Sequence, residues 1–128
     1  MAVAQHAKFD VRYDHADRIL HWTMRDFWEM ADVAAFATAM QRAVAVLGAP
    51  PHVYDALCDS RGFPVQSGEV SLALGRINDV GRTMRSGRTA IVVGSTMNKL
   101  QAQRTLIDPD LRVFLTLDAA MAWLGEKP

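Results

Sequence analysis

Serine and histidine side chains are the first candidates for chemistry, because a serine hydroxyl becomes nucleophilic when a histidine and a carboxylate lie beside it. The histidines stand at four positions: His6, His15, His21 and His52. All lie in or near a predicted N-terminal hairpin or the loop before the third predicted strand, and no Gly-x-Ser-x-Gly motif is present. Ser60 and Ser95 are therefore not predicted to be catalytic. The histidines also lack the helical spacing of metal ligands, so we expect neither a metal site nor a cofactor.

A weaker candidate for chemistry is an anion site at Gly94-Ser95-Thr96, between a predicted strand and a predicted helix. Backbone N–H groups at a helix N-terminus bind phosphate and carboxylate, and Lys99 and Arg104 would add positive charge. The spacing matches neither a P-loop nor a dinucleotide-binding motif. The alternative is that Ser95 or Thr96 only caps the helix.

Large apolar residues in predicted connections are candidates for a binding surface. Phe27, Trp28, Phe63 and Pro64 lie outside the predicted elements, where they could line a ligand groove or a dimer contact. The first predicted helix and the segment 63–81 are rich in Met, Ala and Leu, a composition that can open for an acyl chain but more often forms a packed core. Cys58 lies in an apolar run, and we expect it to be a small buried residue.

The hydrophobic periodicity predicts strands and helices that alternate along most of the chain. The predicted elements are a hairpin of strands 8–14 and 18–25, a helix over 31–47, a strand over 53–59, a helix from the cap Ser67 to Ser86-Gly87, a strand over 89–94, a helix over 97–106, a strand over 111–115 and a last helix capped by Asp118. The β-branched strand 89–94 should be central and parallel. Leu100 and Ile107 should face inward, and Ala122, Trp123 and Leu124 should pack on the sheet. Gly75 and Gly81 should allow close helix packing.

Length and composition favour one compact domain over 1–128, with 1–7 as a flexible tail. No apolar run reaches the length of a membrane span, and the N-terminus lacks the pattern of a secretion signal, so we expect a cytoplasmic protein. The formal net charge is zero. Basic residues gather between Arg76 and Arg104, but they are too few to predict nucleic-acid binding, and we interpret them as a solvated helix face.

Four short segments in this order resemble one family. They are Phe27-Trp28 closing the second strand, Asp59 ending the third, Lys99-Leu100-Gln101 after the fourth, and the ending from Arg112-Val113-Phe114 to Ala122-Trp123-Leu124. With the element order, they resemble the bacterial STAS/SEC14 domain proteins, also called SpoIIAA-like. The resemblance implies an α/β fold with a mixed, mostly parallel sheet of about five strands and four helices, in the order ββαβαβαβα. It also implies similarity to anti-sigma-factor antagonists and to lipid-exchange domains, while the family's own biochemical role is largely undefined.

The sequence departs from the antagonists where they carry a phosphorylated serine. That serine follows Asp-Ser and precedes a Gly, whereas this chain reads Asp59-Ser60-Arg61-Gly62. Arg61 occupies the phosphoacceptor position, which puts a kinase-controlled switch in doubt. Ser60 stands one residue early as a substitute phosphoacceptor, or it bonds neighbouring backbone amides in the loop.

The sequence leaves three functions open. The first is a non-enzymatic regulatory domain that presents the loop 59–67 and the second helix to a protein partner or to a second copy in a homodimer. The second is binding of a lipid or another small apolar molecule, and the third is a small enzyme that acts on an anionic substrate. The candidate surface residues are Trp28, Asp59, Ser60, Arg61, Phe63, Ser95, Thr96 and Lys99.

Overall fold

The computed structural model describes residues 2–46, 54–83, 87–106 and 108–126. Within these ranges, one sheet contains six strands in sequence order: β1 (Ala2–Gln5), β2 (Phe9–Asp14), β3 (Ile19–Arg25), β4 (Asp55–Gly62), β5 (Thr89–Val93) and β6 (Leu111–Phe114). The first three strands are antiparallel, and β3 through β6 run parallel. The helices are α1 (Met30–Val46), α2 (Gly68–Arg82), α3 (Thr96–Thr105) and α4 (Leu117–Gly125). From β2 onward the order is ββαβαβαβα, which confirms the predicted α/β fold.

The strand β1 adds to the predicted sheet. It lies in the segment 1–7, which we expected to be a flexible tail, and it pairs antiparallel with β2. Backbone hydrogen bonds position such an edge strand without an apolar side-chain pattern, so the sequence carries little signal for it. The strand β5 is central, parallel to both neighbours and buried at all five residues, as predicted.

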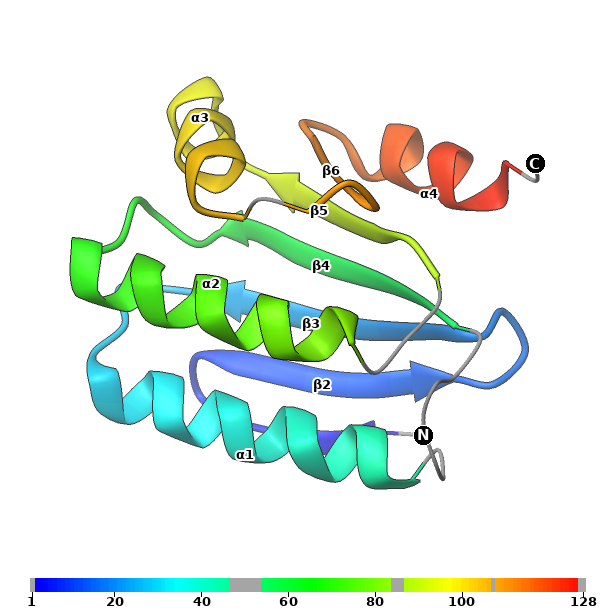
Figure 1. The fold of residues 1–128 in the computed structure, drawn as a ribbon, viewed down its shortest axis with the longest axis horizontal. Coiled ribbons are helices and arrows are strands. Elements are labelled where there is room, and N and C mark those ends of the chain that lie inside the picture. Colours follow the sequence, from blue (N-terminus) through cyan, green and yellow to red (C-terminus); the bar gives the residue numbers. More distant parts are fainter. Residues whose placement is uncertain (1, 47–53, 84–86, 107, 127–128) are drawn as a thin grey trace.

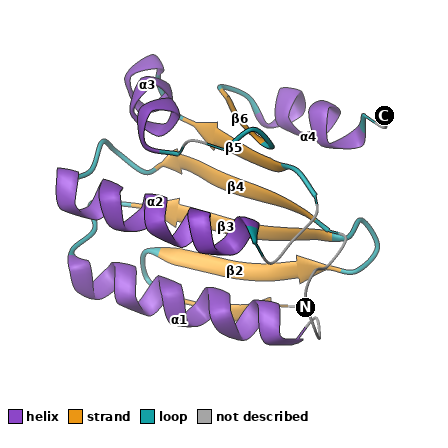
Figure 2. Ribbon diagram, viewed as in Figure 1, coloured by secondary structure: helices purple, strands orange, loops and turns teal. Residues whose placement is uncertain are grey.

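The two faces of the sheet are covered unequally. Helices α1 and α2 lie side by side over one face (Figures 1 and 2), and residues of α3 pack against the same core. That core contains Phe9, Val11, Trp28, Phe36 and other buried residues. On the other face α4 packs on β4, β5 and β6 only, through Ala120, Trp123 and Leu124. Within the described residues, no helix lies over the part of this second face formed by β2 and β3.

The structure corrects several predictions about helix caps and about which helix residues face inward. Ser67 caps α2 as predicted, but α4 is capped by Thr116, whose hydroxyl accepts from the N–H of Ala119, and Asp118 lies in the first turn. Leu100 is 51 % exposed, and the side of α3 that faces the protein carries Asn98, Gln101 and Ala102 instead. Ala122 is exposed, and Ala120 packs on the sheet in its place.

Some predictions for single residues are confirmed, and others fall on residues that the structure does not describe. A Cβ on Gly75 would lie 3.1 Å from the carbonyl oxygen of Thr105, so this glycine does allow α2 to pack closely on α3. Arg76, Arg82 and Arg104 are exposed as predicted. The predictions for Val53, Arg85, Ser86 and Ile107 lie outside the described residues.

Removing the cap of α2 is expected to lower stability modestly. The hydroxyl of Ser67 accepts a hydrogen bond from the N–H of Val70 at 3.2 Å, and Ser67→Ala leaves that N–H without this partner. We expect a loss of about 1 kcal/mol in the free energy of unfolding, measured by urea denaturation. Ser67→Asp should restore most of it, since aspartate is also a good cap. Equal midpoints for Ser67→Ala and the unmutated protein would show that the cap contributes nothing.

Candidate functional site

The candidate residues gather at one edge of the sheet, where the parallel strands β4 and β5 end. Asp59, Ser60 and Arg61 close β4, and Ser95 begins the turn from β5 into α3. The side-chain amide of Asn98 donates to the carbonyl of Phe63 at 2.9 Å, so α3 and the loop after β4 are in direct contact. A Cβ on Gly94 would lie 2.5 Å from the carbonyl oxygen of Arg61, which explains why glycine stands at this crossing.

Asp59 and Arg61 form an ion pair on the surface of the sheet. Alternation along β4 places both side chains on the same face, and the guanidinium donates to the carboxylate at 2.9 and 2.7 Å. The side chain of Arg61 is 51 % exposed. The hydrogen bond from Arg61 lowers the pKa of Asp59 and raises that of Arg61. Arg61 is therefore engaged with its neighbour and remains accessible to a partner.

Ser60 points to the opposite face and is buried, with 4 % of its surface exposed. Its hydroxyl donates to the carbonyl of Val92 at 2.8 Å, which links β4 to β5. This bond joins two strands, whereas we expected contacts with loop amides. A kinase could not reach the hydroxyl in this conformation, so the structure gives Ser60 a role in packing and does not favour it as a substitute phosphoacceptor.

Trp28 belongs to the core and not to the surface on which we placed it. It is 1 % exposed, and its ring lies 5.2 to 5.7 Å from the rings of Phe9, Phe36 and Phe63. Its indole N–H donates to the carbonyl of Arg25 at 3.0 Å. Phe63 is half-buried because it packs against Trp28. Of the two neighbours in the sequence, Phe27 is the exposed one, at 55 %.

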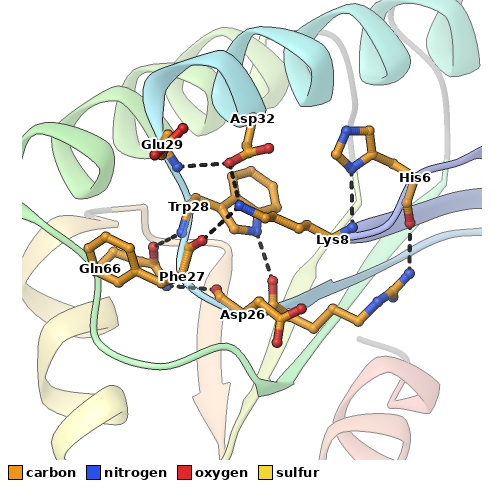
Figure 3. A network of polar contacts seen from close by, with 9 residues as sticks. His6, Lys8, Asp26, Phe27, Trp28, Glu29, Asp32 and Gln66 are labelled. Carbon is orange, nitrogen blue, oxygen red and sulfur yellow. Dashed lines mark hydrogen bonds and ion pairs between the residues drawn. The ribbon is translucent and has the colours of Figure 1, made fainter.

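Gln66 connects the two loops at this edge, and sequence reasoning missed it (Figure 3). It is 6 % exposed; its side-chain oxygen accepts from the N–H of Trp28 at 2.7 Å, and its amide nitrogen donates to the carbonyls of Asp26 and Pro64. From α3, the side-chain amide of Gln101 donates to the carbonyl of Gln66 at 3.2 Å. A single glutamine in a loop carries no sequence signal of burial, so only tertiary structure reveals this network.

The segment before α1 is also held by a lysine from the other side (Figure 3). The ammonium of Lys8 donates to the carboxylate of Asp32 at 2.9 Å and to the carbonyl of Phe27 at 3.0 Å. The same carboxylate accepts from the N–H of Glu29, and these bonds lower the pKa of Asp32. The hydrogen bond to Asp32 raises the pKa of Lys8. Polar contacts therefore fix the loop around Trp28 at both ends.

The predicted anion site resolves into a helix cap. The hydroxyl of Ser95 accepts from the N–H of Asn98 at 3.1 Å, which is the capping alternative. Thr96 is exposed in the first turn of α3, and Lys99 is half-buried. Nothing among the described residues adds a second feature that points to an anion here.

An apolar cavity of about 130 Å³ lies behind the loop that carries Phe63. Residues of the sheet, α1, α2 and α3 line it. Its lining includes Trp22, Met24, Phe36, Met40, Cys58, Phe63, Leu74, Ile77 and Ala102, with Gln66, Asn98 and Gln101 on the loop side. Of the predicted surface residues, Ser60 and Phe63 line this cavity, whereas Asp59 lies on the opposite face of the sheet. The cavity wall is mostly apolar, as expected for a packed core with a void in it.

Cys58 is expected to be unreactive in the native protein. It is 2 % exposed, and burial raises the pKa of its thiol, so the thiolate needed for reaction is scarce. Ellman's reagent should detect almost no thiol under native conditions and one thiol per chain in concentrated guanidinium chloride. Rapid labelling of the native protein would mean that the cavity opens readily to reagents of this size.

The described part of the chain holds no group of three or more His, Cys, Asp or Glu side chains that could bind a metal ion. Among its helices, none is both long and apolar enough to cross a membrane.

No model of a known protein family matches this sequence, and no curated protein matches it. A solved structure is similar to it: an uncharacterized protein of the DUF3478 family with a SpoIIAA-like fold, from Shewanella loihica PV-4. The two chains superpose with a TM-score of 0.69 at 14% sequence identity, over 94% of this chain and 97% of the other. This similarity agrees with the family resemblance of the sequence, and the chain has a SpoIIAA-like fold.

Proposed function

We propose that this protein is a non-catalytic regulatory domain whose ligand is a small apolar molecule held in the cavity behind Phe63. One observation carries the proposal: Phe63, which we expected on the surface, forms part of the wall of an apolar void of about 130 Å³. The candidate residues are used as a cap, an ion pair and packing contacts, and this supports binding over catalysis.

The size of the cavity limits the class of ligand. Drug-sized ligands fill about 300–1,000 Å³, whereas an apolar cavity of roughly 150 Å³ stays dry and takes up benzene. A volume of about 130 Å³ therefore suits one aromatic ring or a short branched alkane. A complete acyl chain does not fit this conformation, which narrows the SEC14-like hypothesis to small apolar molecules.

The loop links the cavity to the surface. Phe63 lines the void, and two residues later Val65 is 44 % exposed beside α2. Gln66 holds this loop to the segment around Trp28. A ligand that pushes on Phe63 therefore acts on the surface that we expected to meet a partner, and this connection is the regulatory part of the proposal.

Toluene is a suitable probe of the cavity. We expect it to raise the melting temperature of the protein and to shift the NMR signals of amides near Leu74 and Ala102, which line the void. Ala102→Leu should abolish both effects because the larger side chain fills the space. Ala45→Leu, at an exposed position of α1, is the matched control and should leave them intact. Toluene binding that survives Ala102→Leu, or no binding at saturation, would refute the proposal.

A protein-binding surface formed by α2 and the loop 59–67 is the second candidate function. It is supported by three exposed apolar side chains, Val65 at 44 %, Leu72 at 57 % and Val80 at 66 %. The partner could be a second copy of the chain. Light scattering should then show a dimer that Leu72→Asp dissociates, whereas Val46→Asp, at an exposed position of α1, should leave the dimer unchanged. A monomeric unmutated protein would end the homodimer hypothesis.

A further inference from the structure

The uncovered part of the second sheet face forms a groove beside α4. Its volume is about 440 Å³, within the range of about 300–1,000 Å³ that is usual for small-molecule sites. Strand register arranges its floor in two rows across β2, β3 and β4. The first row is Arg12, His21 and Leu57, and the second is Asp10, Thr23 and Asp59. The groove lies on the opposite face of the sheet from the apolar cavity.

The charges on this floor leave one guanidinium in excess. The carboxylate of Asp10 is paired with Arg25 at 3.1 Å, and that of Asp59 with Arg61 at 2.7 Å. Arg12 is exposed, and its guanidinium makes no hydrogen bond or ion pair with any residue in the described ranges. Both acidic side chains of the groove are already paired, and Asp14, whose pKa Arg12 lowers, is not part of the groove lining, so the guanidinium of Arg12 favours an anion there.

His21 adds a titratable ring next to Arg12, its partner across the strands. Within the described residues, its Nε2 is buried and has no hydrogen-bond partner. Burial lowers the pKa of His21, and Arg12 lowers it further, while Asp14 and Asp17 act in the opposite direction. The ring is therefore mainly neutral near pH 7. Because Nε2 is buried, a ligand in the groove meets the ring of His21 and not this nitrogen.

The side of the groove towards α4 is apolar. Leu57 is buried on the floor, and Leu117 and Met121 project from α4, with Met121 38 % exposed. Leu117 is also the first residue of α4, so the positive end of a helix dipole lies at the same groove. An occupant that fits both sides therefore combines an acid group with an apolar part.

We propose that this groove binds a small organic acid with an apolar tail. Its carboxylate bonds to the guanidinium of Arg12 beside the ring of His21, and its tail lies against Leu117 and Met121. The proposal is independent of the apolar cavity, since the two sites share neither a face of the sheet nor a ligand charge.

Binding of this kind depends on pH in a defined direction. A carboxylate beside His21 raises its pKa in the complex above the value in the free protein. Affinity is then highest below the free pKa and falls as the pH rises through the bound pKa. The groups that act on the ring are Arg12, Asp14 and Asp17, and the neighbours from β4 and α4 are Leu57, Leu117 and Met121, which do not titrate.

Octanoate is the probe, with octanol and inorganic phosphate as comparators. NMR titration of the full chain should show octanoate shifting amide signals of Arg12, His21 and Met121 and the ring nitrogens of His21. Arg12→Gln should weaken binding at least about tenfold, because a charge-assisted hydrogen bond is lost. Arg42→Gln, the same substitution at an exposed position of α1, should not alter the affinity for octanoate. His21→Gln should remove the change of affinity between about pH 5.5 and pH 8.

Each outcome of these titrations either supports the groove site or overturns it. Octanoate shifts in the groove, together with the loss in Arg12→Gln and not in Arg42→Gln, support the site. The proposal is overturned if octanol or phosphate binds as tightly as octanoate, if Arg12→Gln has no effect, or if the groove signals do not move at millimolar octanoate. Octanoate shifts confined to Leu74 and Ala102 would also overturn it, because they would place the acid in the apolar cavity.

Discussion

Trp28→Ala is expected to lower the free energy of unfolding by about 3–5 kcal/mol, the usual cost of truncating a fully buried tryptophan. Trp28 is 1 % exposed and contacts three phenylalanine rings, so truncation leaves a void that rigid neighbours cannot fill. It also removes the donor that bonds to the carbonyl of Arg25. Urea denaturation followed by circular dichroism measures the loss.

The adjacent residue provides a matched control. Phe27 is 55 % exposed, so Phe27→Ala truncates an aromatic side chain that is largely in contact with solvent. Its cost should stay below about 1 kcal/mol, because little buried surface is lost. If both variants lose the same stability, the placement of Trp28 in the core is wrong. If Trp28→Ala does not fold, Trp28→Phe should still fold and show a smaller loss.

The sequence predicted most of the fold because its signals are local. Alternation at 8–14 and 18–25 reflects a hairpin that is buried on one side, and the uninterrupted apolar strand 89–94 reflects β5, which is buried on both. Ser67 and Gly75 act as predicted for the same reason, since a cap and a close helix crossing depend on few neighbours. The order of these elements, together with four short segments that resemble the family, predicted the SpoIIAA-like fold.

Features that depend on tertiary contacts could not be predicted. Trp28 and Phe27 are adjacent aromatic residues, and only the position of Gln66 and the other rings determines which is buried. Leu100 is exposed because Asn98 and Gln101 of the same helix bond to the loop after β4. Thr116 and Asp118 are both good capping residues, so their choice depends on where β6 ends.

The candidate site divides according to the face of the sheet. Side chains alternate between the two faces along β4, so Ser60 lies in the core under the helices, and Asp59 and Arg61 lie on the other face. Residues that are adjacent in the sequence therefore belong to two separate sites, an apolar cavity and a charged groove. The sequence alone suggests one site for these residues, because it does not reveal which part of the sheet α4 leaves uncovered.

Gln66→Leu is expected to lower the free energy of unfolding by about 3 kcal/mol, because buried polar groups lose their partners while the volume stays similar. The N–H of Trp28 loses the acceptor at 2.7 Å, and the carbonyls of Asp26 and Pro64 lose their donor. Since Gln66 is 6 % exposed, water cannot easily replace these bonds. The loss is measured by urea denaturation, and hydrogen exchange should show faster exchange at the Trp28 amide.

Gln103→Leu is the matched control, since Gln103 is an exposed glutamine of α3, and its effect should stay within about 0.5 kcal/mol. The two variants distinguish a local role from a global one. Faster exchange confined to the loops around Trp28 and Phe63 would mean that Gln66 mainly closes the cavity, and toluene should then enter Gln66→Leu faster than the unmutated protein. Equal stability of the two variants would show that the Gln66 hydrogen bonds contribute nothing, because a buried and an exposed glutamine would then be equivalent.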